Sequence, residues 1–170
     1  MMEMVNDICE ILNVIDEWRE AAEKENSYFA KFALEYFAFN SLLRITFAPD
    51  KRVTDRTLIE RFKGWIKCKN LKFKWKDDKN PIKELIEITR ERDLKNLTKD
   101  KKIQIKNEGD WNNIIEAVYV IRNNLFHGHK QYSRERDEKL VEVGYEILSK
   151  FNDALISNLR EYYLGGVQND

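Results

Sequence analysis

The stretch YFAKFALEYFAFNSLLRI, Tyr28 to Ile45, decides the fold class of this chain. Its apolar side chains fall on nearly every side of a helical wheel, and only a few polar residues interrupt them. A helix that is apolar all round is buried by other elements on all sides. We therefore predict a central core helix that begins after Ser27, a suitable N-cap, and ends at Phe47 before the helix-breaking segment 48–50.

Apolar residues at helical spacing continue on both sides of this segment, whereas strand-like alternation is nearly absent. With six Gly and two Pro in 170 residues, the chain offers few helix breakers. We predict an all-α antiparallel bundle of five or six helices that forms one domain over residues 1–170. The further helices are expected at residues 3–24, after Thr54, at 81–92 after Asn80, from 111 to 126 or 127 after Asp110, and from 133 to a point before Gly165. The Lys-rich segment 93–109 is expected to be mostly loop.

Composition excludes several classes of protein. A hydrophobic content of 42% and a charged content of 35% are typical of a globular domain. No apolar run approaches the ~20 residues that span a bilayer, and the N-terminus is acidic where a signal peptide would be basic. The two cysteines, Cys9 and Cys68, are too few for a disulfide framework and lack the spacing of a zinc site. We expect a cytoplasmic protein without membrane association, metal or cofactor.

The formal net charge is zero, but the charges are unevenly distributed along the chain. Residues 1–48 carry nine acids and four bases, whereas residues 61–79 carry eight bases and two acids. Within the basic stretch, bases alternate with aromatic residues, which favours an extended segment over a helix. Bases and aromatic rings together are typical of a surface that binds single-stranded nucleic acid. The candidate RNA-binding residues are Lys72, Phe73, Lys74, Trp75 and Lys76. Alternatively, Phe62 and Trp65 belong to the core and the lysines form a solvated face.

The stretch YVIRNNLFHGHK, Tyr119 to Lys130, contains the only two histidines of the chain. On a helix that ends near residue 127, Arg122, Asn123 and His127 lie beside the apolar row that faces the core. A histidine in the last turn is favoured in its charged form by the helix dipole. No acid stands three or four residues from Arg122, so its partner has to come from elsewhere. Alternatively, these side chains only cap the helix end and contact water.

The segment RNNLFHG resembles the R-x4-6-H motif of the HEPN family (higher eukaryotes and prokaryotes nucleotide-binding), with Arg122 and His127 as the motif residues. The aromatic segment 28–45 is similar to the second core helix of that family. The resemblance implies an all-α fold and a metal-independent ribonuclease that works as a homodimer, with the motifs of two subunits facing each other. Some HEPN toxins have tyrosine two residues after the histidine, and this chain has His129 there.

RNA carries its own nucleophile, the 2′-OH, so a ribonuclease needs a proton acceptor, a proton donor and positive charge beside the phosphate. His127 suits the proton transfer, and Arg122 suits bidentate contact with phosphate oxygens. Asn123 is expected to orient His127 or the phosphate. His129 and Lys130 are candidate RNA contacts, with solvated loop residues as the alternative. Glu35 is either a buried partner of Arg122 or a carboxylate at the surface edge.

The expected function is therefore cleavage of RNA by a homodimer, giving a 2′,3′-cyclic phosphate and a 5′-hydroxyl. The resemblance also implies a role in a stress or phage-defence system, including a toxin–antitoxin pair with a cognate antitoxin or defence partner. Two alternatives remain open. One is a non-catalytic HEPN module that binds RNA or a nucleotide through the same residues. The other is a helical adaptor in which these polar residues are a dimer contact.

Overall fold

The computed structural model describes residues 2–48, 52–75, 79–96, 101–126 and 135–165. These residues form six α-helices and two short strands, so the all-α prediction is confirmed. The helices are α1 (Met2–Lys24), α2 (Tyr28–Phe47), α3 (Asp55–Lys69), α4 (Pro81–Glu91), α5 (Trp111–Phe126) and α6 (Glu135–Leu164). The strands are β1 (Leu94–Asn96) and β2 (Lys101–Ile103), which pair antiparallel with Leu94 opposite Ile103.

The helix boundaries agree with the capping residues in the sequence. The Thr54 side chain accepts a hydrogen bond from the backbone N–H of Thr57 at the start of α3. The Asn80 side chain accepts hydrogen bonds from the N–H groups of Ile82 and Lys83 at the start of α4, with Pro81 at the first helical position. These side chains satisfy N–H groups that have no partner within their own helix.

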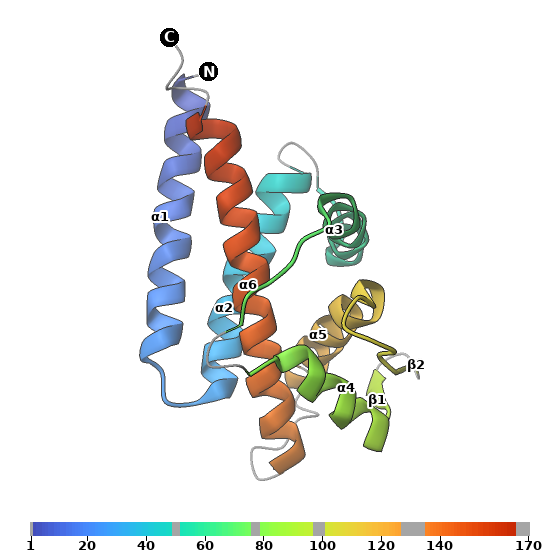
Figure 1. The fold of residues 1–170 in the computed structure, drawn as a ribbon. Coiled ribbons are helices and arrows are strands. Elements are labelled where there is room, and N and C mark those ends of the chain that lie inside the picture. The colour runs from blue at the N-terminus through green and yellow to red at the C-terminus, as the bar shows by residue number, and fades with distance from the viewer. Residues whose placement is uncertain (1, 49–51, 76–78, 97–100, 127–134, 166–170) are drawn as a thin grey trace.

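The long helices α1, α2 and α6 pack side by side (Figure 1). The antiparallel prediction holds for α1 and α2, which a short loop connects, but α2 and α6 run in the same direction. Tyr28 in the first turn of α2 pairs with Tyr145 in the first half of α6, and Phe39 pairs with Phe151 further along both helices. A short connection forces two packed helices to be antiparallel, whereas α2 and α6 are separated by three other helices and are free of that constraint.

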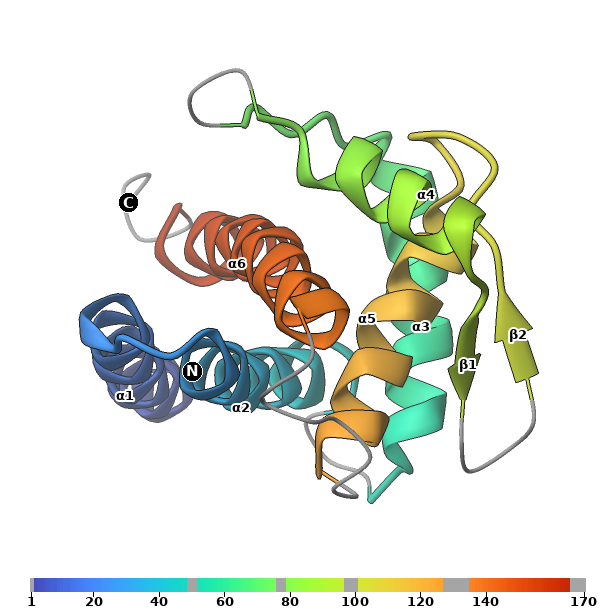
Figure 2. The ribbon, with the colours of Figure 1, turned by 90° about the horizontal axis from the view of Figure 1, so that it is seen from below.

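A second group of elements consists of α3, α4, α5 and the strand pair. This group lies on the side of α2 and α6 that faces away from α1 (Figure 2). Helices α3 and α5 are antiparallel: Asp55 at the start of α3 contacts Arg122 near the end of α5, and Lys63 contacts Glu116 one to two turns earlier in α5. This arrangement brings the C-terminal end of α5 beside the N-terminal end of α3.

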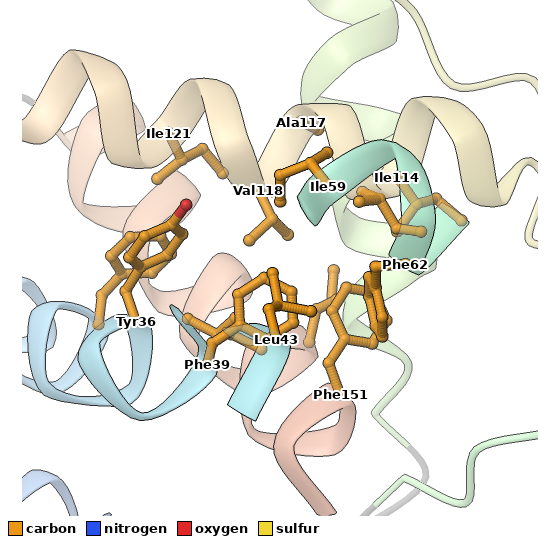
Figure 3. Packing of buried hydrophobic residues seen from close by; sticks show 14 of the residues in the cluster. Tyr36, Phe39, Leu43, Ile59, Phe62, Ile114, Ala117, Val118, Ile121 and Phe151 are labelled. Atoms are coloured by element: carbon orange, nitrogen blue, oxygen red, sulfur yellow. The ribbon is translucent and has the colours of Figure 1, made fainter. Parts of the chain in front are cut away.

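The two groups share one aromatic core, which Figure 3 shows in detail. Phe151 of α6 contacts Phe39 of α2 and Phe62 of α3, with ring centroids 6.2 and 5.1 Å apart. Gly144 allows α6 to approach closely, because a Cβ atom there would lie 3.0 Å from Phe32 and 3.2 Å from Ile121. Eight of the 20 residues of α2 are buried and most of the others are half-buried, but Phe37 is exposed, so the prediction that α2 is buried on all sides holds only in part.

The prediction that residues 93–109 are mostly loop is wrong for the six residues of β1 and β2. Leu94, Ile103 and the following Ile105 are buried, and the Asn124 side chain of α5 donates a hydrogen bond to the Lys95 carbonyl at 2.9 Å. Strands of three residues are too short to show an alternating pattern, and their stability comes from packing under α5.

Within the described part of the chain, none of the helices combines the length and the apolar character that crossing a bilayer requires.

Candidate functional site

Arg122 lies in the last turns of α5 and packs beside two aromatic rings, Tyr36 and Phe126, which contact each other edge to face with centroids 6.2 Å apart. Its guanidinium carbon is 5.2 Å from the ring centroid of Tyr36 and 5.1 Å from that of Phe126. Tyr36 is a buried residue of α2, and burial raises the pKa of its phenol. Stacking on aromatic faces suits the flat guanidinium group and restricts its orientation. The side chain of Arg122 remains 24% exposed, so solvent still reaches it.

Two polar side chains complete the surroundings of Arg122. Its Nη1 donates a hydrogen bond to Oδ1 of the buried Asn123 at 2.9 Å, and its Nη2 lies 3.5 Å from Oδ2 of Asp55. Asn123 was expected to orient His127 or the phosphate, but its described contact is with Arg122. Asn123 is therefore a positioning residue for the guanidinium. The acid that pairs with Arg122 is Asp55 of α3. Because it lies on another helix, the spacing of residues along α5 could not identify it.

His127 directly follows Phe126, the last residue of α5. His127, His129 and Lys130 lie outside the described residues, as does Lys76. Of the predicted catalytic residues, the structure therefore brings together Arg122 and Asn123.

Glu35 is not a partner of Arg122, which corrects one of the two alternatives for this residue. Its carboxylate accepts hydrogen bonds from Nε of Arg19 at 3.2 Å and from the buried side chain of Asn152. Burial raises the pKa of Glu35 although Arg19 and Asn152 act in the opposite direction. The alternative of a surface-edge carboxylate is also wrong, because Glu35 is buried. It ties α1 to α2 and α6.

The basic-aromatic segment Leu71–Trp75 crosses α6 as an extended chain (Figure 1). Phe73 packs on Trp111 and Phe151, with ring centroids 5.5 and 5.9 Å apart. This aromatic ring thus contributes to the core, whereas Lys72 and Lys74 are exposed. Phe62 is fully buried and stacks on Trp65.

An open cleft of about 440 Å³ lies between this segment and α6. Trp65, Phe73 and two acids contribute to its lining. Four lysines also line it: Lys69, Lys72, Lys74 and Lys150. Among the described residues, no carboxylate lies within ion-pair distance of Lys69, Lys72 or Lys74, whereas Lys150 pairs with Asp153 at 3.5 Å. The cleft therefore carries positive charge next to apolar surface.

A second charged cluster, between α3 and α5, did not emerge from the sequence. Glu116 is 3% exposed and accepts hydrogen bonds from Arg56 and from Lys63, each at 2.7 Å. Burial alone would raise the pKa of Glu116, but the hydrogen bonds from Arg56 and Lys63 outweigh it and lower the pKa to about 2. This cluster fixes α3 on α5 and so helps to place Asp55 beside Arg122. The sequence pattern that could have indicated this cluster is an acid on the buried face of α5, Glu116, together with two bases on α3, Arg56 and Lys63.

The low pKa of Glu116 predicts a loss of stability in acid. The carboxyl pKa falls from an ordinary 4.5 to about 2 on folding, so the unfolded chain binds the proton more tightly. The stabilisation is fully present above pH 4.5 and decreases as the pH falls towards 2, by about 3 kcal/mol. Urea denaturation of the wild type and of Glu116→Gln, followed from neutral to acidic pH, measures this contribution.

Glu60→Gln is the matched control, because Glu60 contacts the same Arg56 and Lys63 but is half exposed. Exposed ion pairs contribute roughly 0–1 kcal/mol, so this variant should follow the wild-type pH dependence. If Glu116→Gln loses stability in parallel with the wild type below pH 4.5, the assignment is wrong.

Comparison with models of known protein families, with curated proteins and with solved structures yields no match for this chain.

Proposed function

We propose that this protein is a HEPN-like, metal-independent endoribonuclease whose site consists of Arg122, Asn123 and His127. The observation that carries the proposal is the placement of the Arg122 guanidinium. It is oriented by two aromatic rings and by Asn123, remains accessible, and precedes His127 by five positions in the sequence. Such an orientation prepares a guanidinium to bind phosphate oxygens, and the R-x4-H spacing supports a nuclease over a plain helix cap.

The reaction is a transesterification within the RNA strand. The 2′-oxygen attacks the adjacent phosphorus, and a neutral His127 accepts the proton of the 2′-OH. The bond between phosphorus and the 5′-oxygen breaks, and a charged histidine donates the proton that the leaving oxygen requires. Arg122 stabilises the negative charge that develops on the non-bridging oxygens. The products are a 2′,3′-cyclic phosphate and a 5′-hydroxyl.

We propose a homodimer because the reaction needs one histidine as the base and another as the acid. Near a two-fold axis, each subunit contributes the same residues, so His127 of one subunit can accept the proton and His127 of the partner subunit can donate one. An exposed aromatic pair beside Arg122 supports this arrangement. Phe37 and Phe126 are 49% and 41% exposed, and their rings stack with centroids 6.1 Å apart.

Wild-type protein is therefore expected to sediment as a dimer at micromolar concentration, and Phe37→Asp as a monomer with reduced cleavage. A charge in the centre of an apolar contact removes its stabilisation and repels its symmetry mate. Tyr162→Asp is the matched control, since Tyr162 is a 75% exposed aromatic residue near the end of α6. A monomeric wild type, or a Phe37→Asp variant that remains dimeric, would count against this interface.

The cleft beside α6 is the proposed path of the RNA strand. Lys72 and Lys74 contact phosphates there, and exposed parts of the aromatic rings provide stacking surface. The assignment of Lys76, His129 and Lys130 as further contacts rests on the sequence. By resemblance, we also propose a role in stress or phage defence, with a cognate antitoxin or defence protein as partner.

A cleavage assay tests the function directly. Single-stranded RNA is incubated with the protein in excess EDTA, and the ends of the products are analysed. We expect cyclic phosphate and 5′-hydroxyl ends, and no cleavage of an oligonucleotide whose scissile ribose lacks the 2′-OH. Activity that disappears with EDTA refutes the metal-free mechanism. Binding of RNA without any cleavage favours the non-catalytic module instead.

A further inference from the structure

The carboxylate of Asp55 bridges two arginines from different helices. Its Oδ1 accepts a hydrogen bond from Nη2 of Arg44 at 2.8 Å, and its Oδ2 lies 3.5 Å from Nη2 of Arg122. Arg44 belongs to the last turn of α2, Asp55 to the first turn of α3, and Arg122 to α5. Three helices thus bring two guanidinium groups to one carboxylate, and Arg122 is distant in sequence from the other two residues.

This arrangement differs from an ordinary surface ion pair. One negative charge faces two positive charges, so the group has an excess of one positive charge. All three side chains are partly exposed: 44% for Arg44, 28% for Asp55 and 24% for Arg122. Two oxygens on one central atom, each facing a different guanidinium, also match the two non-bridging oxygens of a phosphodiester.

We propose that Arg44 and Arg122 form a two-arginine clamp for a phosphodiester of RNA, and that the Asp55 carboxylate competes with the phosphate for this clamp. The inference rests on the proposed function, since it assigns Arg122 to the scissile phosphate and adds Arg44 as a second phosphate-binding residue. When the phosphodiester binds, its two oxygens take the positions of the two carboxylate oxygens. In the absence of RNA, Asp55 keeps both guanidinium groups in place. The phosphate has to displace the Asp55 carboxylate from them, and this competition lowers the affinity of the clamp for RNA.

The experiment separates binding from cleavage by using a 2′-O-methyl RNA oligonucleotide, which has no nucleophile. Its affinity is measured against salt concentration for the wild type, Arg44→Gln and Asp55→Asn. The matched controls are Arg160→Gln and Asp16→Asn, because Arg160 and Asp16 form a similar exposed ion pair at 2.9 Å between α6 and α1. Circular dichroism verifies that each variant is folded.

Loss of Arg44 is expected to weaken binding several-fold at low salt and to flatten the slope of log affinity against log salt by about 0.7, the value for one phosphate contact. Asp55→Asn is expected to strengthen binding at low salt, since the competing charge is gone. The control variants should match the wild type. Arg44→Lys provides a second test: it keeps the charge, and with it the salt slope, but loses affinity because ammonium has no planar fork.

The clamp is refuted if Arg44→Gln behaves like Arg160→Gln, if Asp55→Asn weakens binding, or if the wild type does not bind the oligonucleotide. The outcome is distinguishable from that of the proposed function. Should the variants follow the expected pattern while unmodified RNA is never cleaved, the clamp stands and the nuclease proposal fails. Should RNA be cleaved while Arg44→Gln has no effect on binding, the clamp alone fails.

Discussion

His127→Ala is expected to lower the rate of RNA cleavage by ~10²- to 10⁴-fold, the usual effect of losing one acid–base group. In the proposed dimer the substitution removes both the proton acceptor and the proton donor, so the loss should lie towards the upper end of this range. The affinity for a 2′-O-methyl oligonucleotide should change much less than the rate, because the phosphate contacts are assigned to Arg122 and to the lysines of the cleft. Single-turnover cleavage in excess EDTA measures the effect.

His129→Ala is the matched control for this prediction, as it removes the other histidine of the chain. At saturating RNA it should retain most of the cleavage rate, since the motif spacing assigns the proton transfer to His127 and gives His129 only a contact with RNA. A His127→Ala variant that still cleaves at the wild-type rate would refute the assignment. A pH–rate profile adds a second readout: the wild type should show a bell-shaped curve, and His127→Ala should lose it.

Arg122→Lys is expected to lower the cleavage rate by ~10²- to 10³-fold, comparable to the loss of one donor that stabilises transition-state charge. Lysine keeps the charge, but an ammonium group cannot bind two phosphate oxygens in a plane or hydrogen-bond Asn123 in the same geometry. It also loses stacking area against the rings of Tyr36 and Phe126. RNA affinity at low salt should change much less than the rate, because the charge at this position is retained.

The double variant Lys72→Gln and Lys74→Gln is the opposite case and the control for Arg122→Lys. Both lysines are exposed and line the cleft far along α3 from Asp55, so their loss should weaken binding and flatten its salt slope by ~0.7 for each contact. Turnover at saturating RNA should be unchanged. If Arg122→Lys instead reduces affinity and rate in proportion, Arg122 contributes to binding and not specifically to the transition state.

The ion-pair partners of the buried and half-buried charged residues could not be predicted from the sequence. The sequence allows Glu35 as a partner of Arg122, because Glu35 stands among apolar residues of a core helix and Arg122 lies beside the apolar row of another. The structure pairs Glu35 with Arg19 and Asn152, on the face of α2 towards α1 and α6, whereas Arg122 contacts Tyr36 one residue further round the helix. Adjacent residues on a helix point ~100° apart, so the rotation of α2 against its neighbours decides which one meets Arg122.

The aromatic residues of the basic segment illustrate a similar ambiguity. The alternation of Lys with Phe73 and Trp75 fits two arrangements equally well. The rings can lie on a surface that binds nucleic acid, or they can pack on the core. Phe73 in fact packs on Trp111 and Phe151, while Lys72 and Lys74 point to the cleft. Alternating side chains of an extended segment point to opposite sides, and only the neighbouring elements determine which side is buried.

By itself, the sequence determined the helical fold, the place of α2 in the core, the helix starts at Thr54 and Asn80, and the position of Arg122 and Asn123 near the end of α5. These features depend on spacing and capping within a few turns, where the helix geometry is known in advance. Tertiary structure alone decided that α2 and α6 run parallel, that Glu116 holds Arg56 and Lys63, and that Asp55 bridges Arg44 and Arg122. These contacts join residues from separate helices, and their geometry follows from how the whole core packs, which no local pattern encodes.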